Sequence, residues 1–351
     1  MKTRVPDYFD QFHCLAGACP DTCCGQWEIV VDEVAKERYL SVKGPLGEQI
    51  KNALTTVDSE DCMALVDGKC PLLTKDGLCP IVTELGEDFL STTCHTHPRF
   101  TEIYGGLQET MLSISCPEAA RLLLERQEPL TFLTRMDDTP PEPNDLDGDL
   151  FHLVETSRET AFALVQNRDL PLSDRLALLL CFAQRLEHTM DLPNACYELC
   201  DLYRDPSYQF RQLRRIRRLR RNGTMTFIRQ LLTVMEHLTD QLPDCLDKLE
   251  RPDLTPWEIP LEQLTMYFLF RWWMKIACNG FFWRQAAATV VSVLTVASLA
   301  SVTGDVIESA RLYSKEVEHS DDNMNLLRHA MELPQFSRTE LLKLLEVSHA
   351  I

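Results

Sequence analysis

Fourteen cysteines are the residues of this chain whose type and spacing most readily support chemistry. Eight of them form four short motifs before residue 117: Cys14, Cys19, Cys23, Cys24, Cys70, Cys79, Cys94 and Cys116. Closely spaced thiolates are ligands of zinc, copper(I) and iron–sulfur clusters. The spacing therefore predicts a metal centre held by these eight cysteines. Cys62 lies in the same region but outside any motif.

Metal ligation is favoured over disulfides for two reasons. The adjacent Cys23 and Cys24 cannot easily bridge each other, but both can be directed at one cluster. Residues 1–18 contain no continuous apolar stretch of the kind found in a secretory signal, since Pro6, Asp7 and Asp10 interrupt it. This pattern predicts a cytoplasmic protein, in a compartment where thiols stay reduced.

The spacing of the motifs also bears on the kind of metal. Zinc sites favour paired CxxC motifs, and this chain has none, so an iron–sulfur cluster fits at least as well and zinc remains an alternative. The CxxxCxxC signature of radical enzymes begins at Cys19 and Cys23, but Gln26 stands in its third position. A glycine-rich dinucleotide fingerprint, a P-loop and a nucleophile elbow are also absent from the sequence.

Two motifs carry signals of local structure. Asp76-Gly77 is a tight-turn dipeptide, which predicts a short hairpin that brings Cys70 and Cys79 to one centre. Pro117 suits the first position of a helix, which places Cys116 at the N-cap, where the helix dipole favours a thiolate. His95 and His97 are either further ligands or, in the simpler interpretation, polar neighbours of Cys94.

The composition along the chain changes twice. We expect a cysteine-rich, metal-stapled domain of loops and a short hairpin over residues 1–135 and an acidic, proline-rich linker over 136–149. Residues 150–351 are expected to form an all-α helical domain, so the fold class is mainly α. Apolar spacing predicts helices over 175–190, capped by Ser173, and over 227–242. A third aromatic-rich helix or helix pair is expected over 261–283, and Ser337 is expected to cap a last helix.

The net charge of −18 disfavours a nucleic-acid binder and suits a basic substrate. Residues 285–304 carry no charge over 20 residues, but they are rich in Ala, Val, Ser and Thr. We interpret them as a buried helix, and no membrane partner is expected.

Residues 211–221 hold seven arginines and predict one helix. This helix either docks an acidic partner or phosphates or, as the simpler interpretation, pairs with the chain's own acids, such as those of 137–149. Among the later cysteines, Cys181, Cys245 and Cys278 are expected to behave as small apolar residues. Cys196 and Cys200 share a helix face but lack a third partner.

Five motifs, in order and at matching spacing, resemble the flagellin lysine-N-methylase family. They are Phe12–Asp32, Cys70–Cys79, Leu85–Glu87, Thr93–Arg99 and Leu112–Arg121. The resemblance covers about the first third of the chain. It implies S-adenosylmethionine-dependent methylation of lysine side chains, with flagellin as the protein substrate. It also implies that the cysteines hold a metal centre, which we expect to be a 4Fe–4S iron–sulfur cluster.

Two further functions remain as alternatives to the methylase. One is an iron–sulfur protein that transfers electrons, and the other is a non-enzymatic interaction protein stabilised by zinc. The aromatic segment Met266–Trp283 can supply a wall for methyl-lysine and sulfonium groups, but an aromatic core helix is the simpler interpretation. No catalytic or cofactor-binding residue is assigned from the sequence.

Overall fold

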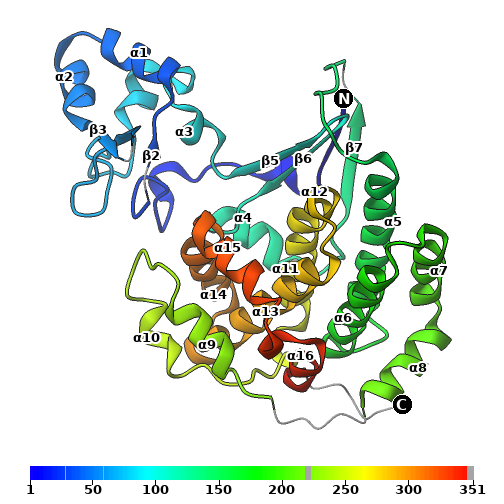
Figure 1. Ribbon diagram of the computed structural model, residues 1–351. Helices are drawn as coiled ribbons and strands as arrows, with labels where there is room; N and C mark the ends of the chain where they lie inside the picture. The colour runs from blue at the N-terminus through cyan, green and yellow to red at the C-terminus, as the bar shows by residue number, and fades with distance from the viewer. Residues whose placement is uncertain (28, 58, 137, 218–222, 346–351) are drawn as a thin grey trace. The chain divides into compact units, whose positions relative to one another are not determined.

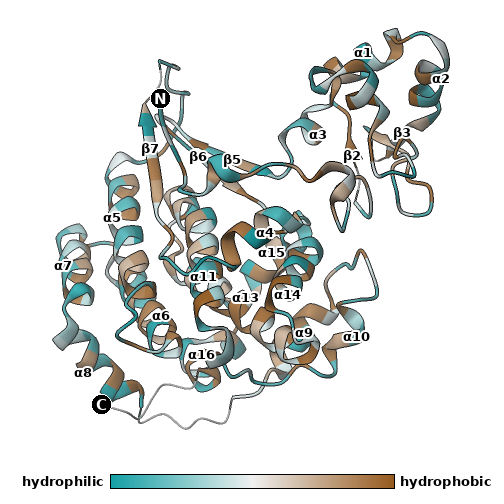
Figure 2. Ribbon diagram, turned by 180° about the vertical axis from the view of Figure 1, so that it is seen from behind, coloured by the Kyte–Doolittle hydropathy of each residue, from teal (hydrophilic) through white to brown (hydrophobic). Residues whose placement is uncertain are grey.

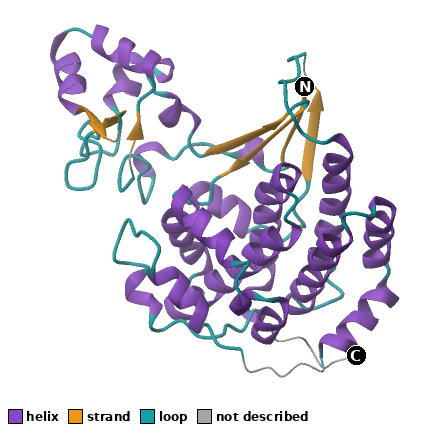
Figure 3. Ribbon diagram, in the orientation of Figure 1, coloured by secondary structure: helices purple, strands orange, loops and turns teal. Residues whose placement is uncertain are grey.

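The chain forms two structural units, which are described separately. The computed structural model describes residues 1–27, 29–57, 59–136, 138–217 and 223–345. A helical unit contains residues 1–9, 101–111 and 121–351, and a cysteine-rich unit contains residues 10–100 and 112–120. The segment 1–135, expected to be one domain, is thus shared between the two units. Helices dominate the structure, which confirms a mainly α fold (Figure 3).

A four-stranded sheet in the helical unit has the order β5-β6-β1-β7. Its strands are β1 (Lys2–Pro6), β5 (Arg99–Tyr104), β6 (Leu107–Leu112) and β7 (Phe132–Met136). Strand β1 runs parallel to β6, with Lys2 opposite Leu107, and antiparallel to β7, with Lys2 opposite Met136. The sheet therefore joins the start of the chain to segments more than 100 residues away.

Every regular element described after residue 147 is a helix, as expected for 150–351. The α-helices are α5 (Gly148–Val165), α6 (Leu172–Thr189), α7 (Pro193–Arg204), α8 (Pro206–Ile216), α9 (Thr226–Thr233), α10 (Pro243–Leu246), α11 (Glu258–Trp272), α12 (Ile276–Asn279), α13 (Phe282–Thr303), α14 (Val306–Tyr313), α15 (Asp321–Ala330) and α16 (Arg338–Leu344). Short 3-10 or π turns join some of them: η5 (Thr255–Trp257), η6 (Trp273–Lys275), η7 (Ser314–Glu318) and η8 (Pro334–Phe336).

Helix α13 forms the core of the helical unit and packs against α6, α11 and α14 (Figures 1 and 2). By length and composition it is apolar enough to cross a membrane, but 83% of its 18-residue apolar window is buried inside the protein. The hydroxyls of Thr289, Ser292 and Thr295 donate to the carbonyls four residues earlier, at 2.8–2.9 Å. These bonds satisfy the buried hydroxyls, so a helix rich in Ser and Thr can occupy the core as expected.

Two predicted helix boundaries were wrong, because distant carboxylates bind the backbone. Helix α6 begins at Leu172, so Ser173 is not its N-cap; the Leu172 amide donates to Glu258 Oε1 at 2.8 Å. Helix α9 ends at Thr233 instead of continuing to residue 242. The amides of residues 238 and 239 donate instead to the buried carboxylate of Glu316, at 2.7 and 3.1 Å.

Three other expected helices are the aromatic segment, the last helix and the arginine segment. The aromatic segment forms a helix pair, since α11 ends at Trp272 and Gly280 adopts φ 75° before α13 begins. The last helix begins at Arg338 with Ser337 in the N-cap position, as expected, but the Ser337 side chain makes no capping hydrogen bond. The arginine segment is helical in α8 as far as Ile216, and residues 218–222 lie outside the described residues.

The cysteine-rich unit combines short helices with a three-stranded sheet of order β2-β4-β3. Its elements are η1 (Phe9–Gln11), η2 (Ala16–Ala18), β2 (Ile29–Val30), α1 (Glu33–Ser41), α2 (Gly44–Ala53), β3 (Leu54–Val57), β4 (Glu60–Met63), η3 (Ile81–Leu85), η4 (Glu87–Phe89), α3 (Thr92–Thr96) and the start of α4 (Pro117–Leu124). A hairpin exists, but it is β3–β4. Asp76-Gly77 makes a tight turn, with Gly77 at φ 71°, and no strand flanks this turn in the described part of the unit.

Candidate metal centre

The first cysteine loop packs directly on the second. A Cβ added at Gly17 would lie 2.7 Å from the carbonyl oxygen of Asp76, so only glycine allows this approach. A Cβ at Gly25 would lie 2.6 Å from the carbonyl oxygen of Gly68. Two motifs separated by about fifty residues are therefore held together by backbone contacts at their glycines.

Cys24 and Cys70 are joined through the main chain. The Cys70 amide donates to the Cys24 carbonyl at 2.7 Å. Nine residues later, the Cys79 carbonyl accepts from the amides of Val82 and Thr83, both at 3.0 Å, at the start of η3. Between them, the Thr74 amide donates to the Leu78 carbonyl at 2.9 Å, so the chain reverses at Asp76-Gly77 as expected.

Cys94 is positioned by a capped short helix. Ser91 is the N-cap of α3, and its hydroxyl accepts from the Cys94 amide at 3.4 Å. The Ser91 amide donates to the buried Tyr39 hydroxyl, and the Thr92 amide donates to Asp32 Oδ2, both at 2.8 Å. Asp32 also caps α1, so one carboxylate fixes two helices of this unit.

Four thiols from three motifs pack on one hydrophobic core. Cys70 belongs to the buried cluster that includes Ala35, Tyr39 and Ile50, and Cys24, Cys79 and Cys94 pack against it. Cys14, Cys19, Cys23 and Cys116 are not part of this packing. The eight predicted ligands therefore separate into a core group of four, Cys24, Cys70, Cys79 and Cys94, and an outer group of four.

The thiols of the core group influence one another. A hydrogen bond from Cys23 lowers the pKa of Cys24 to about 6, while the same bond raises the pKa of Cys23. Burial raises the pKa of Cys70 and of Cys94 to about 11 and also raises that of Cys79, and the proximity of Cys24 adds to each rise. A bound cation would oppose these effects, since it stabilises the thiolate form.

The pKa of Cys116, a member of the outer group, differs from the expectation. It precedes the first residue of α4, as predicted, and the amides of Glu118 and Ala119 act to lower its pKa. Burial nevertheless raises the pKa above its usual value, with further contributions from Cys19 and Cys14. Desolvation of the thiol thus outweighs the helix N-terminus, and the expected thiolate stabilisation does not prevail.

The arrangement does not resemble a site for one ion. No three His, Cys, Asp or Glu side chains in the described residues are placed to hold a single metal ion. His95 is exposed, and the His97 ring lies 5.8 Å from the Trp27 ring. Cys62 is buried in β4 opposite Val30, outside both groups.

Buried ion pairs of the helical unit were not found by sequence reasoning. Glu109 of β6 accepts from Arg158 of α5 at 2.6 and 2.7 Å and from Arg4 of β1 at 2.8 Å. Arg158 and Arg4 lie 49 and 105 residues from Glu109 in the sequence, so no pattern of neighbouring residues indicates these ion pairs. These charges are bound to one another inside the fold, so they do not offer a free reactive group.

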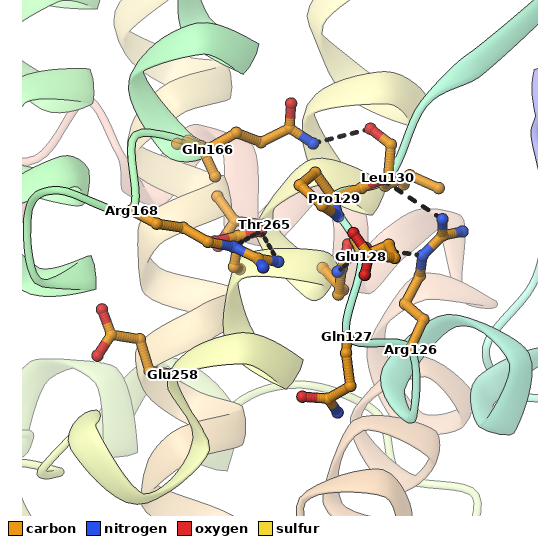
Figure 4. A network of polar contacts seen from close by, with 12 residues as sticks. Arg126, Gln127, Glu128, Pro129, Leu130, Gln166, Arg168, Glu258 and Thr265 are labelled. Carbon is orange, nitrogen blue, oxygen red and sulfur yellow. Dashed lines mark hydrogen bonds and ion pairs between the residues drawn. The ribbon is translucent and has the colours of Figure 1, made fainter.

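A second polar network fixes the loop between α4 and β7 (Figure 4). The carbonyl of Glu128 accepts from Arg126 at 3.1 Å and from Gln263 at 2.8 Å, and Gln166 donates to the Leu130 carbonyl at 2.7 Å. The buried Glu262 accepts from both Arg168 and Arg175. The network holds α11 against α5 and α6. Its role, like that of the first network, is in the fold and not in a reaction.

Neither the aromatic segment nor the described cavity offers a cofactor pocket. Tyr267, Phe268, Trp272 and Trp273 are at most 2% exposed and pack as core residues, the simpler of the two interpretations. A cavity of about 130 Å³ lies between residues 223–228 and 335–344. Its volume is well below the roughly 300–1,000 Å³ typical of small-molecule sites.

Comparison with known proteins shows which family and which relatives the chain matches. A family model described as the FliB lysine N-methylase C-terminal domain matches residues 158–345. The chain is 29% identical over 138 residues to a lysine-N-methylase of Salmonella choleraesuis, covering 35% of this chain and 33% of that protein. It is 32% identical over 133 residues to a lysine-N-methylase of Salmonella typhimurium, with the same coverage of 35% and 33%.

A third relative is a shorter protein. The flagellar biosynthetic protein FliU of Salmonella muenchen is 29% identical over 138 residues, covering 35% of this chain and 78% of that protein. The chain therefore spans about a third of the length of the two lysine-N-methylases that it matches. No solved structure matches the chain.

Proposed function

Because the chain belongs to the FliB lysine N-methylase family, we propose that it transfers methyl groups from S-adenosylmethionine to lysine side chains of flagellin. The family expected from the cysteine motifs is confirmed, but the matching model covers the helical part rather than those motifs. The names of the relatives support lysine methylation in general and a flagellar context. The match over residues 158–345 is the observation that carries the proposal.

A lysine methylase needs a neutral amine as its nucleophile, whereas a free lysine has a pKa near 10.4. The excess of 53 acidic over 35 basic residues attracts lysine-rich segments of a substrate. No described carboxylate is assigned as the base, since Glu109 and Glu262 are held by arginines and Glu316 accepts from backbone amides.

The core group of cysteines fits a soft metal centre. We propose that Cys24, Cys70, Cys79 and Cys94 hold it, with Cys23 beside them, because these four share one core and contribute sulfur only. A 4Fe–4S cluster is proposed in preference to zinc, because the cysteine spacings lack the paired CxxC motifs that zinc sites favour. Such a cluster, when bound, supplies one-electron chemistry or a structural link between the loops. The chain's own contribution is to bring the three motifs together through Gly17, Gly25 and Ser91.

The deciding experiment is a methyl-transfer assay under anaerobic conditions. The purified protein, with its iron and sulfide recorded, is incubated with flagellin and S-adenosylmethionine, and flagellin is read by intact mass and by lysine mapping. Methyl groups on lysine would support the proposal. A metal-loaded protein that adds none would contradict flagellin methylation and favour the electron-transfer alternative, and a zinc-loaded inactive protein would favour the scaffold.

A further inference from the structure

Arginines from three helices approach two neighbouring tyrosines of α7 and α8. Helix α6 packs against both α8 and α16, and in both views these two helices flank α6 at one end of the helical unit (Figures 1 and 2). The arginine cluster is defined here as Arg185 of α6, Arg211 and Arg215 of α8, and Arg338 of α16. All four lie within the part of the chain matched by the family model.

Two members of the arginine cluster contact Tyr208. The Arg185 guanidinium donates a hydrogen bond to the Tyr208 hydroxyl, and its central carbon lies 5.8 Å from the centre of the Tyr208 ring. The corresponding carbon of Arg211 lies 5.5 Å from the same ring centre. Cation–π contacts of this kind hold the two guanidiniums near one tyrosine and restrict their rotamers.

Tyr203 provides a buried hydroxyl beside this pair. Its ring lies 5.2 Å from that of Tyr208, the residue is 0% exposed, and its hydroxyl has no hydrogen-bond partner in the described structure. A buried hydroxyl without an acceptor lowers the stability of the fold, so a ligand that accepts its hydrogen bond would be favoured. Burial raises the pKa of Tyr203, so it remains a hydrogen-bond donor, while Arg185, Arg338 and Arg215 act in the opposite direction.

Arg338 and Arg185 also influence the pKa of a second buried group, the thiol of Cys181. Burial raises the pKa of Cys181 to about 11, and Arg338 and Arg185 oppose this rise. Arg185 belongs to α6 itself, and Arg338 is the first residue of α16, which packs against α6. Arg211 and Arg215 are exposed and Arg185 and Arg338 are half-buried, so the arginine cluster opens to solvent.

No carboxylate of the described residues forms an ion pair with any member of the arginine cluster. Nearby arginines differ in this respect, since Arg217 pairs with Asp174 at 3.5 Å and Arg204 with Asp201 at 3.9 Å. The pairing with acids of 137–149 that the sequence suggested is not seen among the described ion pairs of α8. In a chain with 53 acidic residues, four neighbouring uncompensated arginines are an unusual local excess of positive charge.

We propose that the arginine cluster and the Tyr203 hydroxyl form a binding site for an oxyanion, with the phosphate group of a small molecule as the ligand. Guanidinium groups present paired donors that match phosphate and carboxylate oxygens. Phosphate is preferred over the carboxylate of S-adenosylmethionine, because that molecule also carries an ammonium and a sulfonium that four arginines would repel. A nucleic acid is disfavoured, because the chain as a whole carries a net charge of −18.

The test measures binding of inorganic phosphate to the full-length, metal-loaded protein by calorimetry. The wild type is expected to show saturable binding at one site. Arg338→Gln should weaken it by at least about tenfold, the loss expected for one charge-assisted hydrogen bond. Tyr203→Phe should also weaken binding but leave the melting temperature equal or higher, since it removes an unsatisfied buried hydroxyl.

Arg214→Gln is the matched control, because Arg214 is exposed on the same helix but lies over Phe210. Its binding should equal that of the wild type. Absence of saturable phosphate binding would overturn the proposal, as would an equal loss in Arg214→Gln, which would indicate unspecific charge. Competition by S-adenosylmethionine at this site would overturn the assignment to a phosphate group, since the oxyanion of that molecule is a carboxylate. The readout is binding, so it is independent of the methylation assay.

Discussion

The amide of Cys70 donates a 2.7 Å hydrogen bond to the carbonyl of Cys24, which links two cysteine motifs through their main chains. This bond and the glycine contacts around it bring thiols from distant parts of the sequence onto one core. The consequences for metal binding and stability can be tested one residue at a time.

Gly17→Ala should separate the first cysteine loop from the turn at Asp76, because the new Cβ would lie 2.7 Å from that carbonyl oxygen. We expect a loss of about 1–3 kcal/mol in stability of the cysteine-rich unit and a lower iron content. Gly148→Ala, where no atom lies within 4 Å of the added Cβ, serves as the control. Unchanged iron content and melting temperature in Gly17→Ala would contradict the close packing of the two loops.

Cys94→Ser should reduce the iron content more than Cys116→Ser does. Cys94 packs on the core together with Cys24, Cys70 and Cys79, whereas Cys116 belongs to the outer group. Iron and acid-labile sulfide per chain are the quantities to measure. Cys245→Ser, far from both groups in the sequence, should leave both quantities unchanged. A greater loss of iron in Cys116→Ser would move the ligand set to the outer group.

Arg158→Met should lower the free energy of unfolding by about 3–5 kcal/mol, because it leaves the buried carboxylate of Glu109 with an incomplete set of partners. Arg158 is 0% exposed at its side chain and Glu109 is 4% exposed. Combining it with Glu109→Gln should recover part of the loss. Arg121→Met, which breaks the exposed pair with Glu125, should cost less than about 1 kcal/mol in urea unfolding. Equal losses for both arginine variants would refute the role of burial.

Asp7 should make stability depend on pH in the acid range. Burial raises the pKa of Asp7, but hydrogen bonds from Arg126 and Thr131 outweigh it and hold the pKa below its ordinary value of 3.8. The folded state therefore binds this proton less readily than the unfolded state does. The contribution is fully present above pH 3.8 and is lost as the pH falls through the lowered value.

The variant Asp7→Asn isolates this effect. Its deficit in unfolding free energy relative to the wild type should be constant at neutral pH and should shrink as the solution is acidified. Asp145→Asn, at an exposed aspartate, is the comparison. A deficit that stays the same down to the acid limit would show that the ion pair with Arg126 is not its cause.

The sequence by itself determined the features that depend on neighbouring residues. The order and spacing of the cysteine motifs were sufficient to name the family. Pro117 and Ser337 marked the starts of α4 and α16, and the uncharged segment within 285–304 formed the core helix α13. These features rest on the backbone preferences of single residues and on residue periodicity, which act over a few residues.

Only the tertiary structure decided the features that arise from distant partners. Glu258 moves the start of α6 and Glu316 helps to end α9, each across more than seventy residues. Burial reverses the effect of the helix N-terminus on Cys116, and packing on one core separates four of the eight predicted metal ligands from the rest. The arginine cluster likewise joins three helices whose charges look unrelated in sequence. Burial and long-range pairing depend on how the whole chain packs, so no local pattern encodes them.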